Sequence, residues 1–356
     1  NPIPANSLQK GDFDNIPLID LSTLKGSNLI ERKKLAHQVY EACTHVGFFY
    51  IKNHGIAEEL LDSVHEAARQ FFSLPEEHKM ECYLGKSKKF HGFSPLFAEL
   101  STGADLDDPA DRPSQASFSE AFDIGYETLG DSQKAADDPA PLDPYELYGG
   151  NQWPREDILP GFRGTFLRYY AQALDLSREL MRIFALALDL EEHFFDDKMK
   201  YPGAMSRLMH YPPQPANGEL TAGLAAHTDY ECLTILSQGH VPALQVRNNR
   251  GEWVLATPIP GTLVVNIGDC LATWTNHRFK STIHRVVNLT GEERYTVPFF
   301  FGVDYDVTIS VLESCTSDDR PACEVPFKAG DYVRQKLSRA FIGYDMQPPA
   351  VNSKAT

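Results

Sequence analysis

The residues of this sequence best suited to binding a metal are His227 and Asp229, which are separated by one residue just ahead of an apolar run typical of a strand. In extended backbone, residues i and i+2 point to the same face, so both side chains can reach one point. His284 lies on another predicted strand, and antiparallel pairing can bring it beside them. Two imidazoles and one carboxylate suit iron(II) and leave positions open for substrate and dioxygen. We therefore predict a mononuclear non-haem iron(II) centre on these residues.

The prediction depends on the three residues occurring together. The sequence has 12 histidines, so a single His-x-Asp pair can arise by chance, and a single strand histidine is often a hydrogen-bonded core residue. His210, which precedes Tyr211-Pro212-Pro213, and His277, in a turn after Asn276, are interpreted as structural residues or as supports around a metal site.

A second pair of residues suits a bound acid. Arg294 and Thr296 share one face of a predicted strand. A guanidinium matches a carboxylate through two parallel hydrogen bonds, and a neighbouring hydroxyl can add a third. The strongly apolar residues 297–301 follow directly. A charged group that enters such a core needs a bound partner or an ion pair.

Several longer runs resemble the iron(II) and 2-oxoglutarate dependent oxygenases of the isopenicillin N synthase-like branch. The resemblance covers most of the chain, and the ordered set of motifs is highly specific. The runs that carry it are residues 210–213, 223–230, 263–269, 276–286 and 293–300, with residues 16–21, 47–56 and 118–125 in the N-terminal part.

The resemblance implies iron(II) on the three residues named above, with 2-oxoglutarate chelating the metal through its keto acid. Arg294 and Thr296 would then hold the distal carboxylate, with help from Tyr211. Two departures from the family pattern concern this co-substrate site. Thr296 stands where serine is common, and Met209 stands where many members have asparagine. Neither change touches the metal ligands.

The implied reaction consumes dioxygen, decarboxylates 2-oxoglutarate to succinate and CO2, and oxidises an unactivated C–H bond of a small-molecule metabolite. Hydroxylation, desaturation and cyclisation remain open, as does the substrate, which we expect to come from amino-acid or specialised metabolism. Phe93, Tyr230 and Phe301 are the residues predicted to line the substrate site.

Two other functions are compatible with the same residues. A 2-oxoglutarate-independent iron oxidase of the same fold can use Arg294 and Thr296 to anchor a substrate carboxylate. A zinc hydrolase, or a jelly-roll binding protein without catalysis, can also hold a metal on this ligand set. Activity that survives with zinc and without oxygen would identify the hydrolase.

A β core must position these residues. Short apolar runs separated by turn residues predict a sandwich or jelly roll, and the resemblance implies its double-stranded β-helix form. The expected fold is α+β with a mainly β core, an N-terminal helical α/β region and a C-terminal helix. The predicted strands are 206–211, 232–237, 244–246, 253–256, 263–267, 281–289 and 295–302, preceded by strands 16–21 and 48–51; the predicted helices are 29–46, 56–71, 160–190 and 330–341.

The chain is expected to form one catalytic unit with three parts. Residues 1–160 form the α/β region and include a long irregular insertion, about 93–158, which is a candidate lid. Residues 161–305 hold a long helix that backs the jelly-roll core. Residues 306–356 form a C-terminal extension with the last helix.

Composition narrows the choice of partners. The formal net charge of -16 disfavours binding to nucleic acid or to anionic membrane surfaces. No apolar run approaches the roughly 18 residues that a membrane span needs, and the amino end lacks the pattern of a signal peptide. The 6 cysteines show no disulfide or C-x-x-C framework. A cytoplasmic enzyme with a small-molecule substrate is therefore expected.

Overall fold

The core of the protein is a pair of β-sheets, seen in a computed structural model that describes residues 13–99, 117–135, 138–139, 141–214 and 222–341. The main sheet has the order β1 (Leu18–Asp20), β2 (Phe48–Lys52), β10 (Thr262–Ile267), β7 (Leu233–Ser237), β12 (Arg294–Phe301), β5 (Ala204–Tyr211), β4 (Glu120–Ile124) and β3 (Gly92–Ser94). The smaller sheet has the order β6 (Leu224–His227), β11 (His284–Val286), β8 (Leu244–Arg247) and β9 (Trp253–Leu255). A two-stranded ribbon joins β13 (Thr308–Ile309) to β14 (Phe327–Lys328). The predicted α+β fold with a mainly β jelly-roll core is confirmed.

Long antiparallel strands form the centre of the main sheet. β12 pairs with β5 on one side and with β7 on the other. Side chains alternate between the two faces of a strand, and one face of these strands lines a cavity between the sheets while the other packs against helices. On β12, the even-numbered residues from Arg294 to Phe300 line the cavity.

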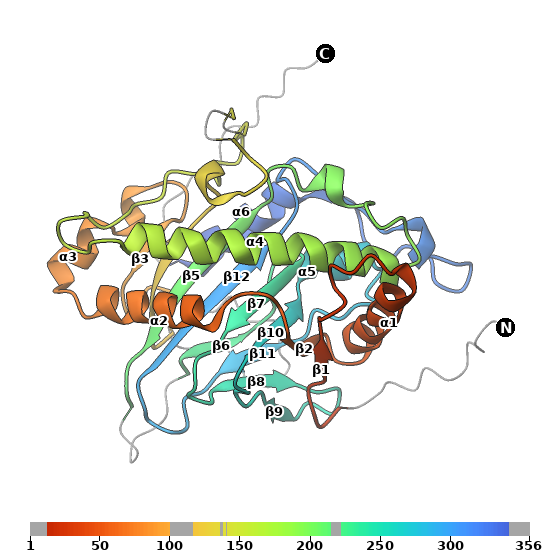
Figure 1. The fold of residues 1–356 in the computed structure, drawn as a ribbon, viewed down its shortest axis with the longest axis horizontal. Helices are drawn as coiled ribbons and strands as arrows, with labels where there is room; N and C mark the ends of the chain where they lie inside the picture. The colour runs from red at the N-terminus through yellow and green to blue at the C-terminus, as the bar shows by residue number, and fades with distance from the viewer. Residues whose placement is uncertain (1–12, 100–116, 136–137, 140, 215–221, 342–356) are drawn as a thin grey trace.

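Helices cover the outer face of the main sheet. In Figure 1, α4 (Phe162–Ala187) crosses the sheet, with α2 (Glu58–Phe72) and α1 (Leu29–His45) beside it. Two α4 side chains are bonded to the sheet, because the Tyr169 hydroxyl donates to the Val297 carbonyl and the Tyr170 hydroxyl donates to the Ala204 carbonyl. One face of α4 is buried, which agrees with the prediction of a long helix that backs the core.

The ends of α1 follow from its sequence. The Asn28 side chain accepts hydrogen bonds from the first-turn amides of Ile30 and Glu31, which caps the helix. Gly47 ends it with a left-handed φ of 77° and donates its amide to the Ala42 carbonyl. A Cβ at this position would lie 2.3 Å from the Lys280 carbonyl oxygen, so only glycine fits.

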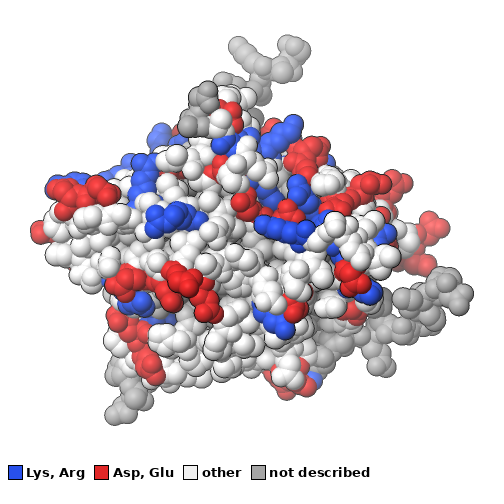
Figure 2. All heavy atoms as spheres, viewed as in Figure 1, with Lys and Arg blue, Asp and Glu red and all other residues white. Residues whose placement is uncertain are grey.

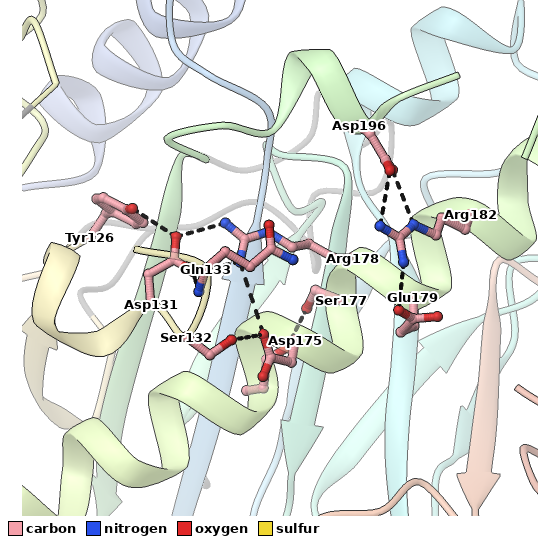
Figure 3. Close-up of polar contacts among 11 residues, drawn as sticks. Tyr126, Asp131, Ser132, Gln133, Asp175, Ser177, Arg178, Glu179, Arg182 and Asp196 are labelled. Atoms are coloured by element: carbon pink, nitrogen blue, oxygen red, sulfur yellow. Dashed lines mark hydrogen bonds and ion pairs between the residues drawn. The ribbon is translucent and has the colours of Figure 1, made fainter. Parts of the chain in front are cut away.

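A buried ion pair fixes the segment that follows β4 onto α4 (Figure 3). Both Nη nitrogens of Arg178 donate to Asp131 at 2.7 Å, and the Tyr126 hydroxyl donates to the same carboxylate at 2.7 Å. The side chains of Arg178 and Asp131 are 4% and 0% exposed. This geometry satisfies both buried charges, which would otherwise be costly to bury.

The remaining helices are short, apart from one near the C-terminal end. They are α3 (Glu76–Glu81), α5 (Asp269–Trp274) and α6 (Ala329–Ala340), with 3₁₀ helices at Leu84–Lys86, Thr128–Gly130, Asp196–Lys198 and Glu313–Cys315. Helix α6 lies within one residue of its expected bounds at each end, whereas α3, α5 and β6 were not predicted.

Part of the expected insertion, residues 93–158, belongs to the core. β4 lies inside it and pairs with both β3 and β5 in the main sheet. Residues 100–116, 136–137 and 140 of the candidate lid lie outside the described residues. The division of the chain into three parts therefore stays a prediction.

Acidic and basic side chains are interspersed over the face shown in Figure 2. Among the helices that the structure describes, none has the length and apolar character required to cross a bilayer.

Candidate metal centre

The three predicted metal ligands come together at one end of the smaller sheet. His227 is the last residue of β6 and is paired in register with His284, the first residue of β11. Asp229 follows in the loop after β6, and its Oδ1 lies 3.6 Å from the Nε2 atom of each histidine. The predicted convergence is confirmed.

The local structure around His227 differs from the prediction. His227 ends strand β6, and the next strand, β7, begins only at Leu233. The two ligands therefore do not share a face of one strand as expected. The turn after β6 brings the carboxylate back toward the histidines.

Both histidines are oriented by backbone carbonyls. His227 Nδ1 lies 2.9 Å from the Ala225 oxygen, and His284 Nδ1 lies 3.0 Å from the Thr282 oxygen. A carbonyl only accepts, so each Nδ1 carries the proton. The lone pair of each Nε2 is thus directed toward the shared point, as a metal ligand requires.

Among the described residues, two side chains that are not predicted metal ligands hold Asp229 through its Oδ2 atom. Its Oδ2 accepts hydrogen bonds from the Thr234 hydroxyl at 2.5 Å and from Asn266 Nδ2 at 2.6 Å. Burial acts to raise the pKa of this carboxyl, but the neighbouring His284 and His227 outweigh burial and hold the pKa well below its ordinary value. Oδ1 remains free to face a cation. Sequence reasoning missed both supporting residues, although Asn266 lies in a run quoted for the family resemblance.

Asp269 connects the ligand-bearing segments. Its backbone amide donates to the Asp229 carbonyl at 2.8 Å. Its carboxylate accepts hydrogen bonds from Thr228, which lies between the first two ligands, and from Ser281, three residues before the third. Tyr332 of α6 donates to the same carboxylate at 2.7 Å. One side chain therefore joins both ligand segments to the C-terminal helix. This role was not predicted, although Asp269 ends a run that carries the family resemblance.

Arg294 is a buried cation with an unfilled capacity for hydrogen bonds. It is 1% exposed, and its Nε donates to the Val241 carbonyl at 3.1 Å. Within the described residues neither Nη atom has a hydrogen-bond partner. Burial lowers the pKa of Arg294, and the neighbouring Tyr211 offsets only part of this effect. Two buried Nη groups without hydrogen-bond partners are energetically costly. The site is therefore suited to an anion, and the planar guanidinium matches a carboxylate in shape.

Tyr211 and Thr296 lie beside Arg294 in the same cavity. The Arg294 guanidinium carbon lies 4.9 Å from the centre of the Tyr211 ring. Thr296 is paired with Met209 across the sheet, and the Tyr211 hydroxyl donates to the Met209 sulfur at 3.2 Å. Met209, which replaces a common asparagine, thus contacts Tyr211.

Of the three residues predicted to line the substrate site, one lines the cavity and two do not. Tyr230 lines the cavity. Phe301 is fully buried on the opposite face of β12, so the prediction was wrong by one residue, and Phe300 lines the cavity instead. Phe93 does not line it either, because it packs at 5.9 Å against Phe71 of α2.

The cavity also has an apolar wall from α6 and a partly buried ion pair. Val333, Leu337 and Ala340 of α6 line it at helical spacing. Arg207 and Glu99 also line it, with 2.8 Å between Nη1 and Oε2. Arg207 Nε is further paired with buried Asp123 at 2.6 Å. None of these residues was predicted from the sequence.

The geometry agrees with what comparisons with known proteins show. Residues 16–156 match the family model described as non-haem dioxygenase in morphine synthesis N-terminal, and residues 202–303 match the 2OG-Fe(II) oxygenase superfamily. The 2-oxoglutarate-Fe(II) type oxidoreductase ppzC of Metarhizium majus is 34% identical over 339 residues, which cover 92% of this chain and 87% of that protein. Homoarginine-6-hydroxylase 2-ODD-233 of Oryza sativa is 33% identical, over 85% of this chain and 90% of the relative.

Solved structures show the same likeness. A full-length Neurospora crassa protein crystallised with alpha-KG and thymine is 28% identical and superposes with a TM-score of 0.75, over 91% of this chain and 96% of that one. JOX2, solved with 2OG, Fe and JA, is 28% identical with a TM-score of 0.71, over 94% of this chain and 86% of its own.

Proposed function

Since this chain belongs to the 2OG-Fe(II) oxygenase superfamily, we propose that it oxidises an unactivated C–H bond of a small-molecule metabolite, with 2-oxoglutarate and dioxygen as co-substrates. The observation that supports this most directly is the buried guanidinium of Arg294, whose Nη atoms have no hydrogen-bond partner among the described residues and which lies in the cavity that also holds the metal ligands. A dicarboxylate that chelates the metal would bring its second carboxylate to such a cation.

His227, Asp229 and His284 hold iron(II), and the donor set present fits that ion. Iron(II) bound there with 2-oxoglutarate and dioxygen would supply the oxidising chemistry, in which 2-oxoglutarate would be converted to succinate and CO2. The protein supplies geometry. The carbonyls of Ala225 and Thr282 fix the two imidazoles.

In the proposed binding mode, the Nη atoms of Arg294 donate to the distal carboxylate of 2-oxoglutarate. The Thr296 hydroxyl, on the same face of β12, adds a donor, and the Tyr211 ring packs under the guanidinium. Burial of the arginine keeps water from competing for these hydrogen bonds, which strengthens them. This assignment retains the co-substrate roles that the family resemblance implied.

The substrate is proposed to occupy the part of the cavity near Tyr230, Phe300 and α6. Its wall is largely apolar, with Arg207 and Glu99 as the charged groups. We infer a small metabolite with an apolar body and at least one hydrogen-bonding group, from amino-acid or specialised metabolism. Relatives named for homoarginine, and a structure that contains thymine, support a small polar metabolite. The 6 free thiols support the cytoplasm as its compartment.

The test is anaerobic reconstitution with iron(II) and 2-oxoglutarate. We expect a visible charge-transfer band from the chelate in the wild-type chain and no band in Asp229→Ala. Admission of oxygen should then yield succinate, and compounds that increase its rate are candidate substrates. If iron binds while neither the band nor succinate appears, the 2-oxoglutarate mechanism is wrong, and the iron oxidase becomes the better hypothesis.

A further inference from the structure

A second group of metal-type donors lies at the surface, outside the cavity. His277 follows α5, while Cys323 and Glu324 lie between the 3₁₀ helix Glu313–Cys315 and β14. Their donor atoms all lie within 4.8 Å of one another, and His277 Nε2 is 3.0 Å from Glu324 Oε1. All three residues are exposed. None lines the cavity described above.

Buried Asn276 holds the two segments together without a metal. Its Nδ2 donates to the carbonyls of Cys315 and Pro321 at 3.3 and 3.0 Å. Its Oδ1 accepts from the Cys323 amide at 3.2 Å and from the Cys323 thiol at 2.8 Å. Asn276 is 2% exposed. The thiol is therefore fixed beside the turn that carries His277, and little further ordering is needed for a ligand to bind.

The backbone at this turn is unusual. Asn276 and His277 are consecutive non-glycine residues with left-handed φ values of 52° and 56°. Side chains other than glycine rarely adopt the left-handed region, so surrounding contacts must impose it. The His277 amide donates to the Ala272 carbonyl at 2.8 Å, which closes α5 in this conformation. As a result the imidazole lies next to Glu324 rather than along the helix.

We propose that His277, Cys323 and Glu324 form a second divalent-metal site, selective for zinc and separate from the iron centre. Imidazole, thiolate and carboxylate are the ligand types of protein zinc sites, and three protein ligands leave a fourth position for water. In a tetrahedral zinc site with bonds of about 2.0–2.3 Å, ligand atoms lie roughly 3.3–3.8 Å apart. The donor spacing observed here needs only small side-chain rotations to match.

The thiolate makes the site distinct from the iron centre. A soft sulfur ligand favours zinc over magnesium, calcium or manganese, whereas the catalytic set contains only nitrogen and oxygen donors. Zinc replaces the thiol proton, which is released to solvent, so binding weakens as the pH falls. Bound zinc crosslinks the turn after α5 to the segment that precedes β14. The hydrogen bond from the Cys323 thiol to Asn276 is then lost, while the three hydrogen bonds between Asn276 and backbone groups remain. His277, interpreted from the sequence as a structural or supporting residue, becomes a ligand.

The experiment uses the full chain carrying Asp229→Ala, so that the catalytic centre lacks its carboxylate. Zinc is titrated against a chromophoric chelator, and cobalt(II) is used to detect a thiolate charge-transfer band. We expect one zinc per chain, a cobalt–thiolate band, and a rise in Tm of about 3–6 °C at a hundredfold excess of zinc over its Kd.

Conservative substitutions in the same background identify the ligands. Cys323→Ser should abolish the cobalt band, and Cys323→Ser and His277→Gln should each weaken zinc binding at least tenfold. His193→Gln is the matched control, because His193 is exposed and 2.8 Å from a carboxylate oxygen but belongs to no three-donor group among the described residues. The control should bind zinc normally. Absence of zinc binding at micromolar concentration, or a Cys323→Ser chain that retains it, would overturn the proposal and leave the oxygenase function unaffected.

Discussion

Replacement of Arg294 by methionine tests two consequences of its burial, and they have opposite signs. In the protein without co-substrate, Arg294 is a buried charge whose Nη atoms have no partner among the described residues. Methionine fills a similar volume and removes that charge. It also removes the hydrogen bond to the Val241 carbonyl, worth about 1 kcal/mol. We expect the free energy of unfolding of the apo chain to stay constant or to increase.

Binding of 2-oxoglutarate should change in the other direction. Each hydrogen bond from a guanidinium to a carboxylate contributes about 1.5–3 kcal/mol, so loss of two such bonds costs about 3–6 kcal/mol. That loss corresponds to a rise in Kd of roughly 10²–10⁴-fold. The assay is anaerobic calorimetry with iron(II) in place, together with thermal unfolding of the apo chain.

Arg285→Met is the matched control for this substitution. Arg285 is also a strand arginine, but its Nε donates to Gln245 at 2.8 Å and its guanidinium lies over the Trp253 ring, outside the cavity. The control should bind 2-oxoglutarate normally. A Kd that changes by less than tenfold in Arg294→Met would refute the assignment of the distal carboxylate. Destabilisation of its apo chain by several kcal/mol would refute the claim that the buried charge is uncompensated.

Three further predictions follow from other contacts. Asn266→Ala removes one of the two hydrogen bonds to the ligand carboxylate, and iron(II) affinity measured by chelator competition should fall about 10–100-fold; a change below threefold contradicts the proposed support. Arg178→Met leaves Asp131 buried and unpaired, so denaturant unfolding should show a loss of about 3–5 kcal/mol, against at most about 1 kcal/mol for the more exposed Arg182→Met. Burial lowers the pKa of His91 to about 4 in the folded chain, below the value of about 6.5 in the unfolded chain. Protonation of His91 therefore favours unfolding, and the folded state loses stability as the pH falls from about 6.5 toward 4. The loss of unfolding free energy is about 3 kcal/mol. In His91→Gln the unfolding free energy should change less with pH over that range. The same pH dependence in the variant and the wild type would exclude His91 as its cause.

The metal ligands could be predicted because residue type and order carry most of the information. His227, Asp229 and His284 are confirmed as a group, even though the local geometry at His227 was wrong. The strand predicted after the pair is present as β7, but His227 itself ends β6, a strand that was not predicted, so the two ligands do not share one strand face. Strand β6 has only four residues, and its short run is too weak a periodic signal to recognise.

Phe301 was wrongly predicted to line the substrate site, although the sequence contains the information that excludes it. Side chains alternate along a strand, so a cavity-facing Arg294 requires Thr296 and Phe300 to face the cavity too. Phe301 must then face the helices, as it does. A strict application of this alternation corrects the prediction without a structure.

The supports of the site could not be predicted in the same way. Asp269 meets Thr228, Ser281 and Tyr332 through contacts that span up to 63 residues. Which polar side chains meet at such a junction depends on the packing of three separate segments. A single sequence carries no local pattern for it.

The strand order of the main sheet has a consequence for how the chain folds during synthesis. Its inner strands β10, β7, β12 and β5 all come from residues after 203, whereas β1 and β2 at one edge and β3 and β4 at the other come from the first 124 residues. At about 5–20 residues per second, β2 waits roughly 10–40 s for its partner β10. During that time β2, with buried residues such as Phe49 and Ile51, can pair only with β1 and has no inner strand to join. The N-terminal half of the nascent chain is therefore the part most exposed to aggregation, and slower growth at low temperature or holdase chaperones should raise the yield of folded protein more than any change to the catalytic core.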